Sequence, residues 1–194
     1  MNRARLTVLS GPSGVGKGTV VAEVRRRHPE VWVSVSVTTR APRPGEVDGE
    51  HYWFVDDAEF DRMVEAGEFL EWAVVHGRHR YGTPAAPVRA AVAQGRPVIL
   101  EIDLQGARQV RRTCPQARSV FLAPPSWGTL VDRLVGRGTE DVAQMERRLE
   151  TAKAEMAAAD EFDHVVVNDD VGLTVDQLVH LLGLANNTET EGQS

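Results

Sequence analysis

Short hydrophobic runs alternate with helix-period segments along most of the chain. In residues 19–27, for example, Val20, Val21 and Val24 fall on one face of a helix. Alternation of strands and helices is typical of a parallel sheet covered by helices on both faces. The runs suited to buried strands are residues 6–9, 31–37, 97–102, 119–122 and 164–167. The other expected helices cover residues 87–93, 107–112, 130–135, 142–159 and 175–184.

Residues 31–75 break this alternation. The run at 31–37 is followed by a loop, a strand at 51–55, a short helix at 57–65 and a strand at 68–75. These strands are rich in aromatic residues and show two-residue periodicity, which is typical of half-buried strands. We therefore expect a smaller mixed sheet inserted into the parallel core.

Composition narrows the classes of protein that the chain can represent. Its 194 residues fit a single domain, and its formal net charge of −6 argues against non-specific binding to nucleic acid. The single cysteine, Cys114, excludes an intramolecular disulfide and a cysteine-based metal site. No apolar run approaches the ~20 residues that span a bilayer, and none resembles a signal peptide. We expect a cytoplasmic protein without membrane partners, and a disordered polar tail at residues 186–194.

A glycine-rich segment joins the first expected strand to the first expected helix. Such a loop directs successive backbone N–H groups, and the partial positive charge of the helix N-terminus, toward phosphate oxygens. A lysine at its end adds a charge that reaches the β- and γ-phosphates of a nucleotide. The next residue, Gly18, lacks the hydroxyl that usually helps to bind Mg²⁺, so Thr19 or water has to supply that ligand. The loop residues are Gly11, Pro12, Ser13, Gly14, Val15, Gly16, Lys17 and Gly18.

Arginine greatly outnumbers lysine, since Lys17 and Lys153 are the only lysines among 22 basic residues. A codon preference of the genome explains the bulk count equally well. The placement of Arg40 and Arg43 is more informative, because Pro42 and Pro44 stiffen the turn that carries them. Two guanidinium groups held in this way suit a dianionic phosphate.

The insertion carries several motifs in a fixed order. Together with the glycine-rich loop, they closely resemble guanylate kinase over residues 6–170. The resemblance implies a P-loop NTPase-type α/β fold: a parallel sheet with flanking helices, an inserted mixed α/β GMP-binding region and a helical lid. The motifs are the stretches at residues 36–46, 49–54, 69–72 and 81–83.

The resemblance assigns residues of the insertion to the two ends of GMP. Arg40, Arg43, Tyr52 and Tyr81 match the residues that hold the GMP phosphate in this family. The family's base-reading positions are matched by Ser36, Glu71 and Thr83. A carboxylate can accept hydrogen bonds from the adjacent N1–H and N2–H₂ groups of guanine, whereas adenine has no donor at N1.

The acidic segment after the run at 97–102 corresponds to the family's region between the two nucleotides. The resemblance implies that Asp103 contacts the guanine side. It also implies that Glu101, with Thr19, orders Mg²⁺ directly or through water.

Three arginines in and beyond the stretch at 132–138 fit a mobile lid with glycine hinges: Arg133, Arg137 and Arg148. With Lys17 and Arg40, they form the expected catalytic set, because phosphoryl transfer depends on positioning and cationic charge. Solvated helix charges are the alternative interpretation of these arginines. Asn168 resembles the family's adenine contact, or else caps the chain at a turn.

The expected organisation is one domain over residues 1–185, with a core of 1–33, 84–125 and 155–185, an insertion of 34–83 and a lid of 126–154. The expected reaction is ATP-dependent phosphorylation of GMP, with dGMP also accepted. The expected cofactor is Mg²⁺, and the sequence is compatible with a monomer or a homodimer. Two alternatives remain: a kinase of the same fold acting on another monophosphate or a ribosyl phosphate, and a phosphopeptide-binding module that uses the GMP cleft.

Overall fold

A parallel sheet forms the centre of the molecule in the computed structural model, which describes residues 6–75, 78–135 and 142–184, with the backbone alone for 142–144. The sheet has five strands in the order β2-β7-β1-β8-β9, and every neighbouring pair is parallel. This arrangement confirms the expected α/β class. Its strands are β1 (Leu6–Ser10), β2 (Trp32–Val33), β7 (Val98–Glu101), β8 (Arg118–Ala123) and β9 (His164–Val167).

Helices cover both faces of this sheet, as the nearly continuous hydrophobic runs predicted. Successive residues of β1 enter different cores, since Val8 packs with α3 and α4 whereas Leu9 packs with α1 and α7. The four helices are α1 (Lys17–Arg27), α3 (Ala85–Ala93), α4 (Leu104–Thr113) and α7 (Val171–Leu181). The last two begin three to four residues before the expected start, because Asp103 and Asp170 accept hydrogen bonds from backbone N–H groups of the first turn.

The insertion forms a second sheet of four strands in the order β4-β3-β6-β5. Strands β3 and β4 are parallel, and β6 is antiparallel to both β3 and β5, so the expected mixed sheet is confirmed. Phe60 and Met63 of its helix pack against Val37 on one face. Its elements are β3 (Ser36–Thr38), β4 (Tyr52–Phe54), α2 (Asp57–Glu65), β5 (Phe69–Val75) and β6 (His79–Pro84).

The expected single strand at 31–37 is wrong. The structure divides it into β2, which belongs to the central sheet, and β3, which belongs to the insertion. Ser34 N–H still donates to Ile99 O of the central sheet at 3.0 Å, and the chain changes sheets directly after it. Hydrophobicity is continuous through the change because both sheets bury this stretch.

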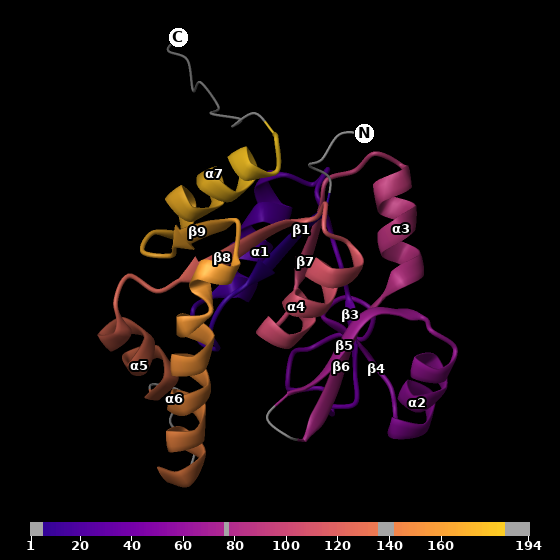
Figure 1. Ribbon diagram of the computed structural model, residues 1–194, viewed down its shortest axis with the longest axis horizontal. Helices are drawn as coiled ribbons and strands as arrows, with labels where there is room; N and C mark the ends of the chain where they lie inside the picture. The colour runs from indigo at the N-terminus through magenta and orange to yellow at the C-terminus, as the bar shows by residue number, and fades with distance from the viewer. Residues whose placement is uncertain (1–5, 76–77, 136–141, 185–194) are drawn as a thin grey trace.

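Two further helices, α5 (Trp127–Val135) and α6 (Val142–Ala157), lie on the other side of the molecule from the insertion (Figure 1). A short 3₁₀ turn at Ala159–Glu161 leads from α6 back to the central sheet. The phosphate loop, α6 and the insertion contribute to one cavity, described below.

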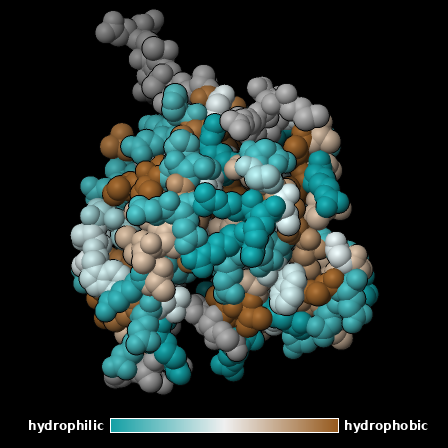
Figure 2. Space-filling model, viewed as in Figure 1, coloured by the Kyte–Doolittle hydropathy of each residue, from teal (hydrophilic) through white to brown (hydrophobic). Residues whose placement is uncertain are grey.

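Hydrophilic residues cover most of the face shown in Figure 2, with hydrophobic residues in separate small areas. Across the described ranges, none of the helices has the length and apolar character needed to cross a bilayer.

Candidate active site

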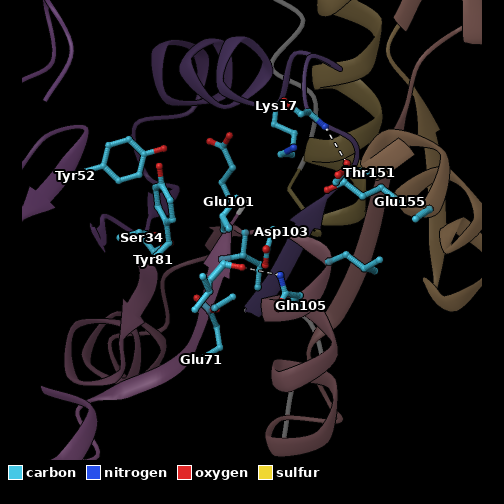
Figure 3. Close-up of a pocket in the computed structure, with 18 of the residues that line it drawn as sticks. Lys17, Ser34, Tyr52, Glu71, Tyr81, Glu101, Asp103, Gln105, Thr151 and Glu155 are labelled. Atoms are coloured by element: carbon cyan, nitrogen blue, oxygen red, sulfur yellow. Dashed lines mark hydrogen bonds between the residues drawn. The ribbon is translucent and has the colours of Figure 1, made fainter. Parts of the chain in front are cut away.

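A cavity of about 560 Å³ opens between the phosphate loop, the insertion and α6 (Figure 3). It begins at Lys17, passes the carboxyl end of β7 and reaches the insertion strands β4, β5 and β6. The carboxyl ends of parallel strands are where such sheets bind ligands. Polar side chains that line it include Lys17, Ser36, Tyr52, Glu71, Tyr81, Glu101, Asp103 and Glu155.

The phosphate loop turns tightly between β1 and α1. Gly16 precedes the helix with φ of 100°, a left-handed conformation that favours glycine. A Cβ atom on Gly11 would lie 2.3 Å from the carbonyl oxygen of Leu122 in β8, so a side chain there would displace the loop. The strand–loop–helix context that the motif requires is therefore present.

Lys17, the first residue of α1, curls back over the loop. Its ammonium donates to the carbonyl oxygens of Gly11 at 2.6 Å and Pro12 at 3.2 Å. Burial lowers its pKa, although the nearby carboxylates of Glu101 and Glu155 oppose this shift. The lysine is therefore held beside the loop, with its charge available to an anion that enters the cavity.

The backbone of Val15, at the centre of the loop, is held from two directions. Its carbonyl oxygen accepts from Asn168 Nδ2 at 2.8 Å and from Arg133 Nη1 of α5 at 3.1 Å. Asn168 is 3 % exposed and also accepts from Thr174 Oγ1 at 3.2 Å. The bond to Val15 joins the end of β9 to the phosphate loop, far away in the sequence, so it is not the local cap at a turn that was the alternative. The assignment of Asn168 as an adenine contact stays a prediction.

Glu155 of α6 is a site residue that the sequence analysis missed. Its Oε2 accepts from the backbone N–H of Ser13 at 3.2 Å, so a carboxylate already lies against a donor of the phosphate loop (Figure 3). Burial raises its pKa, and the charge of Lys17 opposes that shift. The contact places a carboxylate oxygen against a backbone donor of the loop, and it connects α6 directly to the site.

Arg40 is fixed by a network within the insertion. Its guanidinium makes a bidentate pair with Glu46 at 2.8 and 2.9 Å, and its Nε donates to the Tyr81 hydroxyl at 3.1 Å. Glu46 also accepts from the backbone N–H of Arg43 at 2.7 Å. The sequence analysis did not predict Glu46, whose carboxylate orients the turn that carries both arginines and lowers the entropy lost when an anion binds.

Glu71 lies at the opposite end of the cavity, on β5. It is 5 % exposed, and its Oε1 accepts from Thr83 Oγ1 at 2.6 Å. Burial raises the pKa of Glu71 to about 7, and the negative charge of Asp103 acts in the same direction, whereas the hydrogen bond from Thr83 opposes the rise. A buried carboxylate whose hydrogen bonds come from Thr83 retains lone pairs for a ligand that offers further donors.

The raised pKa makes a prediction about folding stability. The unfolded chain binds the proton of the Glu71 carboxyl group less tightly than the folded chain does. The protonated group therefore adds most to the free energy of unfolding below pH 4.5, and this stabilisation is lost as pH rises through about 7. Glu71→Gln removes this loss, which amounts to at most about 3 kcal/mol at pH 8. We expect Tm of the variant minus Tm of the parent to be more positive at pH 8 than at pH 5. Equal differences in thermal unfolding at the two pH values would contradict the assignment.

Two carboxylates occupy the middle of the cavity. Glu101 ends β7, and burial raises its pKa while Lys17 opposes the rise. Asp103 caps α4 and accepts from Gly106 N–H at 2.8 Å. The part of the chain that the structure describes contains no group of three acidic, histidine or cysteine side chains arranged around a metal position. One or two carboxylates fit Mg²⁺ that is held mainly by phosphate oxygens and water.

The remaining predicted residues are distributed as follows. Tyr52 and Tyr81 make an edge-to-face pair with ring centroids 5.8 Å apart beside Arg40. Arg43 and Thr19 are exposed, and Arg148 lies on α6. Arg137, the predicted lid arginine, lies outside the described residues.

Comparison with known proteins places these features in a family. The family model for guanylate kinase matches residues 3–184. A guanylate kinase of Thermobifida fusca is 64% identical over 178 residues, which cover 92% of this chain and 90% of that protein. The guanylate kinase of Nocardia farcinica is 62% identical over 186 residues, 95% of this chain and 96% of that protein. The crystal structure of guanylate kinase from Anaplasma phagocytophilum superposes with a TM-score of 0.74 at 34% identity, over 93% of this chain and 85% of that one.

Proposed function

The chain belongs to the guanylate kinase family, and we propose that it transfers the γ-phosphoryl group of ATP to GMP, giving ADP and GDP. The observation that carries this proposal is the pairing of two features in one cavity. Lys17 of the phosphate loop lies at one end, and the buried Glu71–Thr83 pair lies at the other. The first suits a nucleoside triphosphate, and the second suits the adjacent N–H donors of guanine.

In this proposal, the phosphate loop and Lys17 bind the phosphates of ATP. Arg40 and Arg43, with Tyr52 and Tyr81, bind the phosphate of GMP. Ser36, Glu71, Thr83 and Asp103 bind its guanosine part. A phosphate oxygen of GMP attacks the γ-phosphorus in line, and the bond to the oxygen that bridges the β- and γ-phosphates breaks, releasing ADP. No general base is required, because the attacking phosphate is already an anion.

The chain's cationic side chains stabilise the negative charge that spreads over the transferred group. Lys17 acts from the donor side, Arg40 from the acceptor side, and Arg133 reaches the loop from α5, where it binds Val15 O. Arg137 and Arg148 complete the proposed set. Mg²⁺, when bound with ATP, supplies charge neutralisation between the phosphates, and Glu101 and Thr19 are the side chains proposed to hold it or its water.

The division into a core, an insertion at 34–83 and a lid at 126–154 is also part of the proposal. The separate sheet of the insertion supports the boundary of that part. Closure of the lid would exclude water, which competes with GMP for the phosphoryl group. We further propose that dGMP is accepted and that ATP and GMP are the partners of a cytoplasmic enzyme.

An assay of the products tests the reaction. Purified protein incubated with Mg²⁺, ATP and GMP is expected to form ADP and GDP in equal amounts, followed by ³¹P NMR. A phosphopeptide-binding module would form neither product, and a ribosyl phosphate kinase would leave GMP unchanged while consuming ATP with its own acceptor. Either outcome would refute the proposed function.

The charge state of Glu71 makes GMP binding dependent on pH. Because burial raises its pKa to about 7, the carboxylate fraction falls about tenfold between pH 8 and pH 6. A protonated carboxyl group cannot accept from both guanine donors, so KM for GMP should rise about tenfold over this range. The phosphate of GMP titrates nearby, and Glu71→Gln controls for it, since that variant should retain only the phosphate's pH dependence. A KM for GMP that changes equally in both proteins would contradict this role of Glu71.

A further inference from the structure

Strand β5 lies at the end of the insertion sheet and pairs with β6 on one side only. An edge strand presents unpaired backbone N–H and C=O groups on its other side. Here, helix α4 of the central domain takes up these groups. The Gln109 side chain donates to Trp72 O at 2.6 Å and accepts from Trp72 N–H at 3.3 Å. Gln105 donates to Val74 O at 3.1 Å, as Figure 3 shows.

The geometry follows from two periodicities. Outward-facing backbone groups recur every second residue along a strand, which puts Trp72 and Val74 on the same edge. Side chains four residues apart lie on the same face of a helix, which puts Gln105 and Gln109 opposite that edge. A carboxamide offers one acceptor and adjacent donors, so Gln109 pairs with Trp72 as the backbone of a neighbouring strand would.

The same face of α4 receives the side chain of Glu71, the residue before Trp72. A Cβ atom on Gly106 would lie 2.3 Å from Glu71 Oε2, so any side chain at 106 would collide with this carboxylate. Gly106 is in the first turn of α4, whose partial positive charge favours an anion. The helix thus contacts both the backbone of β5 and the carboxylate next to it.

We propose that Gln109, assisted by Gln105, is a positioning residue for base recognition, which holds β5 where Glu71 packs on Gly106 beside Thr83. The role in recognition rests on the proposed function, since it assumes that Glu71 binds guanine. It makes α4 the outer wall of the base-reading pocket. Selectivity for the acceptor then depends on two glutamines that act through the backbone of β5.

The test is a double-mutant cycle with Gln109→Met, which keeps an unbranched side chain of similar size and loses both hydrogen bonds. The loss of two such bonds predicts an increase of about tenfold in KM for GMP, with KM for ATP unchanged. In a Glu71→Gln background, Gln109→Met should have no further effect on KM for GMP, because both changes act through one carboxylate. Gln177→Met, at an exposed position on α7, is the matched control and should change neither KM. Additive effects in the cycle, or equal changes in both KM values, would overturn the proposal.

Two readouts do not depend on the reaction. The Glu71 carboxyl group, followed by carbon NMR, should titrate at a lower pH in Gln109→Met than in the parent, because the displaced carboxylate is better solvated. Amide exchange of Trp72 should accelerate in Gln109→Met but stay slow in Gln109→Glu, which retains the acceptor for that N–H. If Gln109→Met does not fold, the same measurements are made on Gln109→Glu, which loses the bond to Trp72 O. An unchanged Glu71 titration in the folded variant would refute the positioning role. A parent protein that leaves GMP unphosphorylated would refute the proposed function and the role in base recognition, but not the positioning of Glu71 by Gln109.

Discussion

Replacing Lys17 with methionine is expected to lower kcat by about 10²–10³-fold or more, the usual cost of removing one preorganised charge from a transition state. Methionine keeps the length of the side chain and loses the ammonium that now binds the carbonyl oxygens of Gly11 and Pro12. With the cation gone, charge on the transferred phosphoryl group is left uncompensated at the donor side. Steady-state kinetics with saturating ATP and GMP measure the effect.

The chain offers a matched control for this variant, because Lys153 is its only other lysine. Lys153 is an exposed residue of α6 whose ammonium lies 5.9 Å from the Trp127 ring centroid. Lys153→Met should therefore leave kcat within about twofold of the parent value, as expected for an exposed side chain outside the site. Near-normal turnover by Lys17→Met would show that the loop does not act in catalysis.

Glu71→Gln is expected to remove most of the preference for GMP over AMP. A site built to pair with a substrate's hydrogen-bond donors rejects an analogue that lacks them by as much as ~10⁴–10⁵-fold. Glutamine retains one acceptor and presents an N–H₂ group where guanine also presents donors, so kcat/KM for GMP should fall by about 10²-fold or more. The ratio of kcat/KM for GMP to that for AMP measures the change.

Glu65→Gln provides the comparison for this substitution. Glu65 lies on α2 of the same insertion and is exposed, so removal of its charge tests for a general electrostatic effect on anionic substrates. We expect its GMP-to-AMP ratio to match that of the parent. If Glu71→Gln also leaves the ratio unchanged, Glu71 does not read the base.

The core of the fold was predictable because parallel strands are buried on both faces. Runs such as 97–102 and 119–122 stand out against helices that have a single apolar face. The division of 31–37 between two sheets was not predictable. Val33 and Val37 are both buried, and only the hydrogen-bond partners of their neighbours differ. Strand β6 was missed because Arg80 and Gly82 interrupt any apolar pattern, and pairing with two neighbouring strands forms it.

The residues of the candidate site likewise include some that the sequence predicts and others that it does not. The phosphate loop and the turn at Arg40 and Arg43 are contiguous in the sequence, so their chemistry is readable there. Glu155 accepts a hydrogen bond from Ser13 N–H, 142 positions away in the sequence. Gln109 donates to the backbone of Trp72, 37 positions away. Their own sequence neighbourhoods resemble ordinary exposed helix surface. Glu46 is closer to its partner, but its pairing with Arg40 depends on the turn between them.

Acceptor selectivity of the unmodified protein tests the central claim most directly. With Mg²⁺ and saturating ATP, kcat/KM is measured for GMP, AMP, CMP and UMP under one set of conditions. The buried Glu71–Thr83 pair predicts that GMP exceeds each of the others by about 10³-fold or more. An AMP value within tenfold of the GMP value, or no turnover of GMP, would contradict the account.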